Sequence, residues 1–133
     1  MISAVDSNIL LDILIPDPKF GPASKMALED QSLKGKLTIC EIVYSEVASL
    51  FPTQLLFDKT LSLMQIKLSP LTRHSSFQGG HLWRLYRQAG GLRTRILADF
   101  LIAAHAESQA DQLITRDRGF YRKYFPGLCL IEP

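Results

Sequence analysis

The sequence alternates short apolar segments of strand length with longer segments that carry a helical pattern, and this alternation limits the folds open to the chain. Five segments are short and mostly apolar, as buried parallel strands are: residues 2–5, 37–40, 65–68, 112–115 and 128–131. Helices are predicted over residues 7–14, 23–33, 41–51, 54–64, 72–89, 98–109 and 118–124. Alternation of this kind predicts an α/β fold with helices on both faces of a parallel sheet.

Length and composition suit one domain in a reducing compartment. The chain has 133 residues, 47% of them apolar, and no repeat, low-complexity tract or linker divides it, so we expect a single domain over residues 1–133. No apolar run approaches the roughly 18 residues that span a bilayer, and Met1 leads directly into a strand-like segment. Cys40 and Cys129 each lie in an apolar run, which predicts buried free thiols. These features predict a cytoplasmic protein with no membrane segment.

Two aspartates follow predicted strands. Asp6 comes directly after the strand at residues 2–5, and Asp117 comes just after the strand at residues 112–115. In parallel α/β sheets, ligands bind outside the carboxyl ends of the strands. If these two strands are neighbours, the two carboxylates meet in one crevice, although each aspartate is also a favoured helix cap or turn residue.

Two further acids occupy helix positions where an acid is costly. On a helical projection of residues 41–51, Glu46 falls within the apolar arc that includes Ile42 and Leu50, whereas Glu41 projects to the opposite, solvated side. Asp99 lies in the first turn of a helix that is apolar nearly all round. Helix capping competes with a functional role for Asp99, and a charge at the edge of the core competes for Glu46.

Four carboxylates in one crevice repel one another unless a cation neutralises them. Oxygen ligands alone favour Mg²⁺ or Mn²⁺ over zinc, and the three histidines show no ligand spacing. The sequence contains no phosphate-binding glycine loop, no nucleophile elbow and no C-x-x-C motif. A phosphate-accepting receiver domain is disfavoured because Asp6 has no adjacent acid and no lysine follows a late strand.

The net charge of +2 is unevenly distributed. Between Asp58 and Asp99 the chain has seven lysines and arginines and no acid, so the remainder carries −5. Such a segment is either a solvated basic surface or one that attracts a polyanion. The candidates for phosphate contacts are the arginines next to the proposed acids in sequence, namely Arg93, Arg95, Arg116 and Arg118.

The acids also lie in segments that together resemble a known family. Residues 5–10 (VDSNIL) resemble the D-[ST]-N opening of PIN domains, and residues 38–47 (TICEIVYSEV) resemble the second segment, with Glu46 at its acidic position. Residues 97–106 (LADFLIAAHA) and 113–120 (LITRDRGF) resemble the third and fourth segments. With the ending YFPGL at residues 124–128, the set resembles the VapC toxins of toxin–antitoxin pairs.

The resemblance implies a PIN-like three-layer α/β/α sandwich with a central parallel sheet of about five strands. It implies an Mg²⁺- or Mn²⁺-dependent endoribonuclease that forms a homodimer and is inhibited by a VapB-type antitoxin. Its metal ligands and catalytic residues would be Asp6, Glu46, Asp99 and Asp117. The metal would activate a water that attacks the RNA phosphodiester in line.

Two side chains are candidates for orienting these carboxylates or a water. Asn8 and Thr115 adjoin Asp6 and Asp117 in sequence, although ordinary turn hydrogen bonding also accounts for both. A non-catalytic RNA-binding or protein-interaction module that keeps the fold is the alternative function. A nuclease directed at DNA is a third, because the metal chemistry does not distinguish the sugar.

Overall fold

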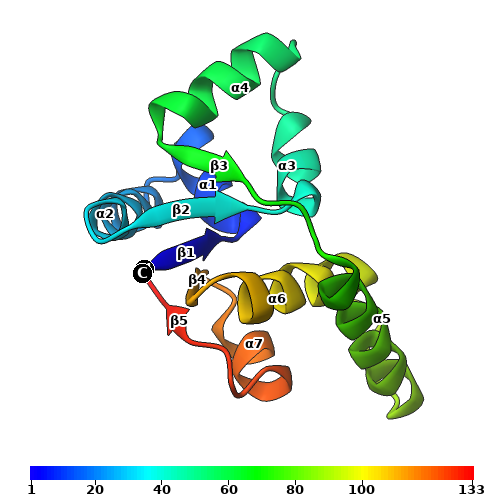
Figure 1. Cartoon of the computed structure of the whole chain (residues 1–133). Helices are drawn as coiled ribbons and strands as arrows, with labels where there is room; N and C mark the ends of the chain where they lie inside the picture. Colours follow the sequence, from blue (N-terminus) through cyan, green and yellow to red (C-terminus); the bar gives the residue numbers. More distant parts are fainter.

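A five-stranded, all-parallel sheet lies at the centre of the chain, in the order β3-β2-β1-β4-β5, with helices on both sides of it (Figure 1). The computed structural model describes residues 1–133, apart from the side chain of Arg118. The strands are β1 (Ile2–Val5), β2 (Lys36–Ile39), β3 (Ile66–Leu68), β4 (Gln112–Ile114) and β5 (Leu130–Ile131). The helices are α1 (Ser7–Leu14), α2 (Gly21–Ser32), α3 (Glu41–Ala48), α4 (Gln54–Leu63), α5 (Arg73–Gln88), α6 (Leu97–Gln109) and α7 (Arg118–Tyr124).

The order of the strands brings the ends of β1 and β4 together. β1 is the middle strand and pairs with β2 on one side and β4 on the other, and Val5 lies opposite Ile114. The backbone N–H of Asp6 continues this ladder by donating to the carbonyl of Ile114 over 3.0 Å. Residues 6 and 115 therefore leave the sheet side by side, as the prediction for neighbouring strands required.

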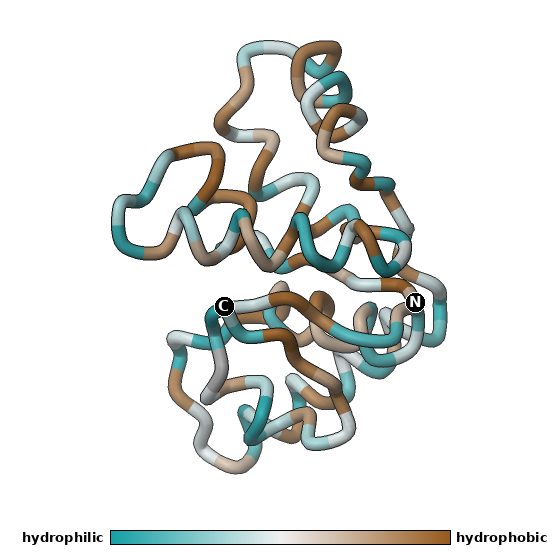
Figure 2. The backbone as a smooth tube through the Cα atoms, turned by 90° about the vertical axis from the view of Figure 1, so that its left-hand side faces the viewer, coloured by the Kyte–Doolittle hydropathy of each residue, from teal (hydrophilic) through white to brown (hydrophobic). Residues whose placement is uncertain are grey.

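The core fills both sides of the sheet. Val5, Ile39, Leu113 and Ile114 are at most 1% exposed because neighbours cover both faces of the central strands. Figure 2 shows the helical segments alternating between apolar and polar residues along their turns, as expected of helices with one buried side. None of the helices in the described chain combines the length and apolar character needed to cross a membrane.

All five strands and seven helices occur where the sequence predicts them, with shifts of a few residues at their ends. The largest shift in a helix is in α3, which ends at Ala48 instead of continuing to residue 51. Leu50 and Phe51 donate to carbonyls three residues back, and Pro52 restricts Phe51, so the helix tightens and stops. Cys40 is buried as predicted, but the prediction for Cys129 was wrong because its side chain is exposed beside the short edge strand β5.

Candidate active site

Asp6 is the most constrained of the four predicted acids. It follows β1, is 6% exposed, and accepts hydrogen bonds on both carboxylate oxygens. Oδ1 accepts the backbone N–H of Ser7 over 2.7 Å, which caps α1. Oδ2 accepts the hydroxyls of Thr115 over 2.7 Å and Tyr121 over 3.0 Å, and the amide of Asn8 lies 3.4 Å away. The carboxylate is therefore held in one orientation.

Burial dominates the electrostatics of Asp6. It raises the pKa of the Asp6 carboxyl from 3.8 to about 6, against the lowering effect of its hydrogen bonds with Thr115, Tyr121 and Ser7. The negative charge of Glu46 raises this pKa further. Asp6 is thus a buried carboxylate whose ionised form is less favourable than it would be in water.

Glu46 lies close to Asp6, but its environment is not the predicted one. Ser7 connects the two acids, because its hydroxyl donates to Glu46 Oε1 over 2.6 Å while its backbone N–H donates to Asp6. The prediction that Glu46 sits within an apolar arc was wrong: the buried face of α3 is formed by Val43 and Val47, and Glu46 is exposed. Because α3 ends at Ala48, Leu50 lies outside the helix, so the helical projection that placed Glu46 beside Leu50 does not apply.

The predicted solvated orientation of Glu41 was also wrong. Its side chain is half-buried, and Oε1 accepts the backbone N–H of Leu71 over 2.9 Å. Glu41 therefore ties α3 to the segment that leads into α5.

Asp99 caps its own helix, and its surroundings raise the pKa of its carboxyl. Its Oδ2 accepts the backbone N–H of Ile96 over 3.0 Å, so the capping contact considered as an alternative is present. Burial raises the pKa of the Asp99 carboxyl, the hydrogen bond with Ile96 and the charge of Arg95 lower it, and the charge of Asp117 raises it. Asp99 and Asp117 are therefore close enough to repel each other.

Asp117 is bound by an arginine. Both of its carboxylate oxygens accept hydrogen bonds from Arg95, in a bidentate pair that is only partly exposed. The guanidinium also lies over the ring of Phe120, 4.4 Å from its centroid. The backbone N–H of Asp117 donates to Thr115 Oγ1 over 3.0 Å, so Thr115 contacts two of the four acids. Arg95, predicted to contact phosphate, is instead paired with a proposed ligand.

Arg116 is committed to a buried acid that the sequence pattern did not single out. Its guanidinium donates to both oxygens of Asp12, over 2.6 and 2.7 Å, and lies 4.0 Å from the centroid of the Phe20 ring. Ser24 donates to the same carboxylate over 2.8 Å, and Asp12 is 4% exposed. The only signal in the sequence was an acid inside the apolar run of α1. Arg116 is therefore not a free cation.

The remaining site predictions are placed as follows. Asn8 joins the strand ends, because its Oδ1 accepts the backbone N–H of Arg116 and its amide approaches both Asp6 and Thr115. Arg93 is exposed. The side chain of Arg118 lies outside the part of the chain that the structure describes.

Tyr121 is a buried hydrogen-bond donor to Asp6. Its side chain is 1% exposed and donates to Asp6, and sequence reasoning did not identify it because an aromatic residue in a helix is usually core. Burial raises the pKa of the Tyr121 hydroxyl well above 10, and the charges of Asp6, Asp99 and Asp117 each raise it further. Tyr121 therefore stays protonated and serves as a hydrogen-bond donor to Asp6.

The donor set suits a hard divalent cation, although the side chains are not arranged as a finished coordination shell. The four acids supply only carboxylate oxygens, which Mg²⁺ and Mn²⁺ prefer. They form two pairs, Asp6 with Glu46 through Ser7, and Asp99 with Asp117 beside Arg95. Within the described residues, no three acids, histidines or cysteines are gathered closely enough to hold a metal ion as they stand. A metal bound by all four acids therefore requires side-chain movement, above all of Arg95.

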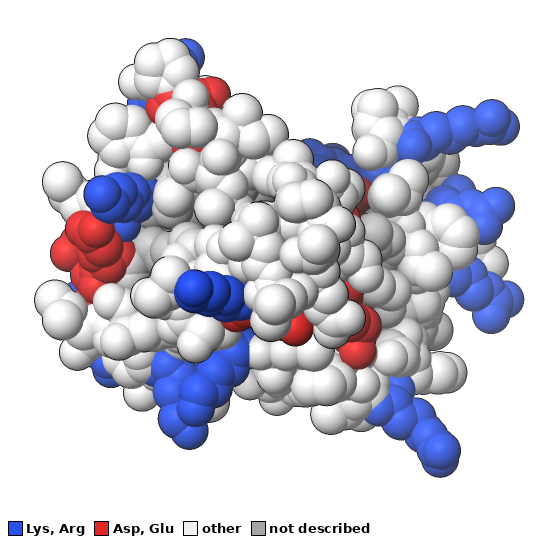
Figure 3. Space-filling model, turned by 90° about the horizontal axis from the view of Figure 1, so that it is seen from above, with Lys and Arg blue, Asp and Glu red and all other residues white. Residues whose placement is uncertain are grey.

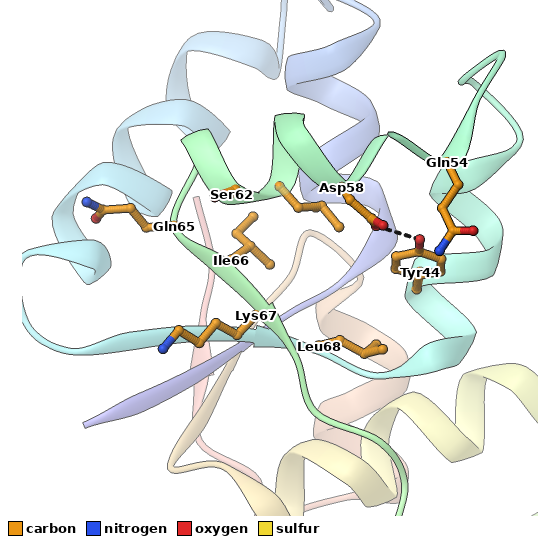
Figure 4. Close-up of a pocket in the computed structure, with 9 residues that line it drawn as sticks. Tyr44, Gln54, Asp58, Ser62, Gln65, Ile66, Lys67 and Leu68 are labelled. Carbon is orange, nitrogen blue, oxygen red and sulfur yellow. Dashed lines mark hydrogen bonds between the residues drawn. The ribbon is translucent and has the colours of Figure 1, made fainter. Parts of the chain in front are cut away.

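A large pocket lies away from the four acids. A hollow of about 690 Å³ adjoins the edge strand β3, where Tyr44 donates to Asp58 over 2.6 Å (Figure 4). Leu68 and Ile66 contribute to its lining, and none of the four predicted acids does. Because the hollow holds no cluster of catalytic groups, we assign the candidate active site to the acidic strand ends instead.

Comparisons with known proteins agree with this architecture. The sequence profile described as "PIN domain" matches residues 4–126, whereas no curated protein gives a significant sequence match. VapBC2 from Rickettsia felis, solved with a DNA fragment from its promoter, is similar with a TM-score of 0.73 and 22% identity, covering 99% of this chain and 98% of the other. A toxin–antitoxin complex from Klebsiella pneumoniae is similar with a TM-score of 0.72 and 22% identity, covering 98% of this chain and 97% of the other. VapBC-1 from nontypeable Haemophilus influenzae is similar with a TM-score of 0.72 and 18% identity, covering 99% of this chain and 98% of the other.

Proposed function

Because this chain belongs to the PIN domain family, we propose that it is a metal-dependent endoribonuclease of the VapC type, which hydrolyses RNA phosphodiester bonds and is silenced by a cognate antitoxin. The observation that carries the proposal is that Asp6 and Asp117 follow the neighbouring strands β1 and β4 and that Thr115 hydrogen-bonds to both of them. Glu46 completes the set, since a single serine separates it from Asp6.

In this proposal the four carboxylates hold Mg²⁺ or Mn²⁺, directly or through water. The bound ion supplies a water of lowered pKa and stabilises the negative charge that develops on the phosphate oxygens. Thr115 and Tyr121 fix the orientation of Asp6, so that this ligand is already positioned before a cation arrives. Ser7 keeps Glu46 within reach of Asp6 by donating to both.

Arg95 has two roles in the proposed reaction. It neutralises Asp117 in the observed arrangement. If Asp117 served as a metal ligand, the Arg95 guanidinium would be free to contact an RNA phosphate, for which its planar fork is well suited. The predicted phosphate contact and the observed ion pair are then two states of one side chain.

The proposed partners are RNA, an antitoxin of the VapB type and a second copy of the chain. The names of the similar structures describe VapBC and toxin–antitoxin complexes, and this supports an antitoxin encoded beside the present chain. An antitoxin that inserts a basic side chain among the carboxylates would use the same attraction that draws Arg95 to Asp117.

The proposal is tested with purified protein and with growing cells. Purified chain should cleave RNA with Mg²⁺ or Mn²⁺ and stop in chelator, and Asp6→Asn should not cleave. Induced expression of the wild type should arrest growth, Asp6→Asn should not, and sequencing should map the RNA that becomes cut. Purified protein that degrades no RNA with either metal would contradict the proposal.

One observation favours the second candidate, a non-catalytic module. Both oxygens of Asp117 are taken by Arg95, and the described residues show no ready three-ligand cluster. Calorimetric titration with Mn²⁺ separates the two functions, because a nuclease takes up the ion at the acids and loses this uptake in Asp6→Asn. No uptake, together with no cleavage, would assign the chain to the module.

A further inference from the structure

Helix α5 presents three arginines on one side. In a helical projection, Arg73, Arg84 and Arg87 fall with Phe77 and Gly80 inside an arc of about 80°, on the side opposite buried Tyr86. We call these five residues the arginine face. The three arginines are exposed, and among the described residues none of them forms an ion pair. No acid occurs between Asp58 and Asp99 to neutralise them locally.

The two adjacent glycines of α5 have different reasons to be glycine. A Cβ at Gly79 would lie 2.8 Å from the Leu101 side chain and 3.2 Å from its backbone, so the packing of α5 on α6 requires this glycine. A Cβ at Gly80 would meet nothing within 4 Å. Glycine destabilises a helix by about 1 kcal/mol relative to alanine. At residue 80 no neighbouring atom would clash with a larger side chain, so packing does not explain the glycine. A small residue in the middle of a basic surface leaves room for a ligand to approach the helix backbone.

Aromatic side chains accompany the arginines. Phe77 is 70% exposed, and its ring stacks on that of His81, with the centroids 5.9 Å apart and the planes 8° from parallel. The guanidinium of Arg87 lies over Trp83, 4.7 Å from the ring centroid. Exposed stacked rings among cations are characteristic of surfaces that bind unpaired nucleic-acid strands, because every base has a face that stacks.

A hollow on the arginine face reaches the first residue of α6. It measures about 540 Å³ and is lined by Gly80, Trp83, Arg84, Arg87, Gln88 and Leu97. Leu97 begins α6, two residues before Asp99. Figure 3 shows lysine and arginine side chains gathered along the side of the molecule where α5 lies. The hollow therefore ends at the helix that carries Asp99.

We propose that the arginine face of α5 binds the backbone of a single RNA strand and guides it toward the acidic strand ends. This inference rests on the proposed nuclease function and deepens it, because it specifies an unpaired strand and the surface that holds it. The arginines contact phosphates, Phe77 and His81 stack on bases, and Gly80 allows the strand to lie close to the helix.

Gly80 provides the sharpest test, because substitutions there change the surface without crowding the fold. Binding of a fluorescent single-stranded RNA is measured in chelator, where no cleavage occurs, for Gly80→Glu, Gly80→Ala and Gly80→Lys of the full chain. We expect Gly80→Glu to weaken binding about tenfold, Gly80→Lys to weaken it less because the added positive charge offsets the added bulk, and Gly80→Ala to change it less than about twofold. All three variants should melt at or above the wild-type temperature, since alanine and longer side chains favour a helix over glycine.

Salt dependence gives a second readout. Replacing both Arg84 and Arg87 with Gln should reduce the slope of log K against log salt by about 1.4, or about 0.7 for each phosphate of a single strand that is no longer neutralised. The control replaces Lys59 and Lys67 with Gln, since these two exposed lysines lie in α4 and β3. An equal reduction in the control would overturn the proposal.

The possible outcomes separate the surface from the proposed function. Equal RNA affinity of Gly80→Glu and Gly80→Ala would overturn the proposal even if the protein cleaves RNA. Loss of affinity in Gly80→Glu alone would support the surface even if no cleavage were found. Duplex RNA or polyglutamate that binds as tightly as the single strand, and with the same sensitivity at Gly80, would overturn the assignment of the ligand.

Discussion

Arg95 donates hydrogen bonds to both carboxylate oxygens of Asp117, so one of the protein's own side chains brings a positive charge into the candidate active site. Arg95 comes from the segment before α6, and Asp117 comes from the segment between β4 and α7. The pair brings a positive charge to a place where Asp99 and Asp117 repel each other. A divalent cation that binds Asp117 must displace this guanidinium or share the carboxylate with it.

Removing the guanidinium should therefore strengthen metal binding. Arg95→Gln should bind Mn²⁺ about tenfold more tightly than the wild type, since a charge-assisted hydrogen-bonded pair is worth on the order of 1.5 kcal/mol or more. Calorimetric titration of the purified chain measures the affinity. Arg93→Gln is the matched control, because Arg93 is an exposed arginine two residues earlier. Equal or weaker Mn²⁺ affinity in Arg95→Gln would show that the pair does not compete with the ion.

The ion pair between Arg116 and Asp12 should contribute strongly to stability. Arg116→Gln should lower the free energy of unfolding by about 2–3 kcal/mol, less than the roughly 3–5 kcal/mol lost from a fully buried pair because Arg116 is partly exposed. Urea unfolding measures the loss. Lys25→Gln breaks the exposed pair with Glu29 and should cost under about 0.5 kcal/mol. Similar losses in both variants would mean that the buried carboxylate of Asp12 does not depend on Arg116.

Asp6 and Asp117 show what the sequence could predict about this site. Both follow short apolar segments, so their place at strand ends follows from local pattern and from the geometry of parallel sheets. The neighbouring positions of β1 and β4, on which their convergence depends, could only be assumed until the sheet order was known.

The contacts that hold the site join residues far apart in the sequence, so local sequence patterns could not predict them. Arg116 and Asp12 lie 104 residues apart, and Tyr121 and Asp6 lie 115 apart. Its place next to Asp117 in the sequence made Arg116 a candidate for phosphate contact, but Asp12 of α1 gives it a buried partner. The projection of Glu46 failed for a related reason, because the extent of α3 depends on Pro52 and the following turn.

Asp6 should make the metal-free protein less stable as the pH rises. The pKa of the Asp6 carboxyl is about 6 in the folded chain, against 3.8 for an unperturbed aspartate. At a pH between these two values, the folded state therefore binds more protons than the unfolded state. The free energy of unfolding contributed by this group therefore falls as the pH rises from about 4 to about 6. In chelator, Asp6→Asn should be more stable than the wild type at pH 7, by on the order of 2–3 kcal/mol, and the difference should shrink toward pH 4. A difference independent of pH would show that Asp6 is not the titrating group.

Tyr121 should lower the pH below which RNA cleavage is lost. Its hydroxyl donates to the ionised form of Asp6, and this lowers the pKa of that carboxyl. Tyr121→Phe removes the donor, so the pH below which cleavage is lost should rise while maximal activity at high pH remains. A profile of kcat against pH measures the shift, which a merely structural role would not produce. Thr115→Val should shift the pH limit of cleavage in the same direction, because Thr115 is a second donor to the same oxygen. An unchanged limit in both variants would contradict this role.

The most direct test of the four-carboxylate metal site compares two glutamates of α3 in one cleavage assay. Glu46 adjoins Asp6 through Ser7, whereas Glu41 accepts the backbone N–H of Leu71, a contact that a glutamine oxygen also accepts. We predict that Glu46→Gln loses Mn²⁺-dependent RNA cleavage while Glu41→Gln keeps most of it. In chelator, Glu46→Gln should melt at or above the wild-type temperature, because one of two repelling carboxylates has been neutralised. Cleavage retained in Glu46→Gln, together with a clear fall in its melting temperature, would contradict the site.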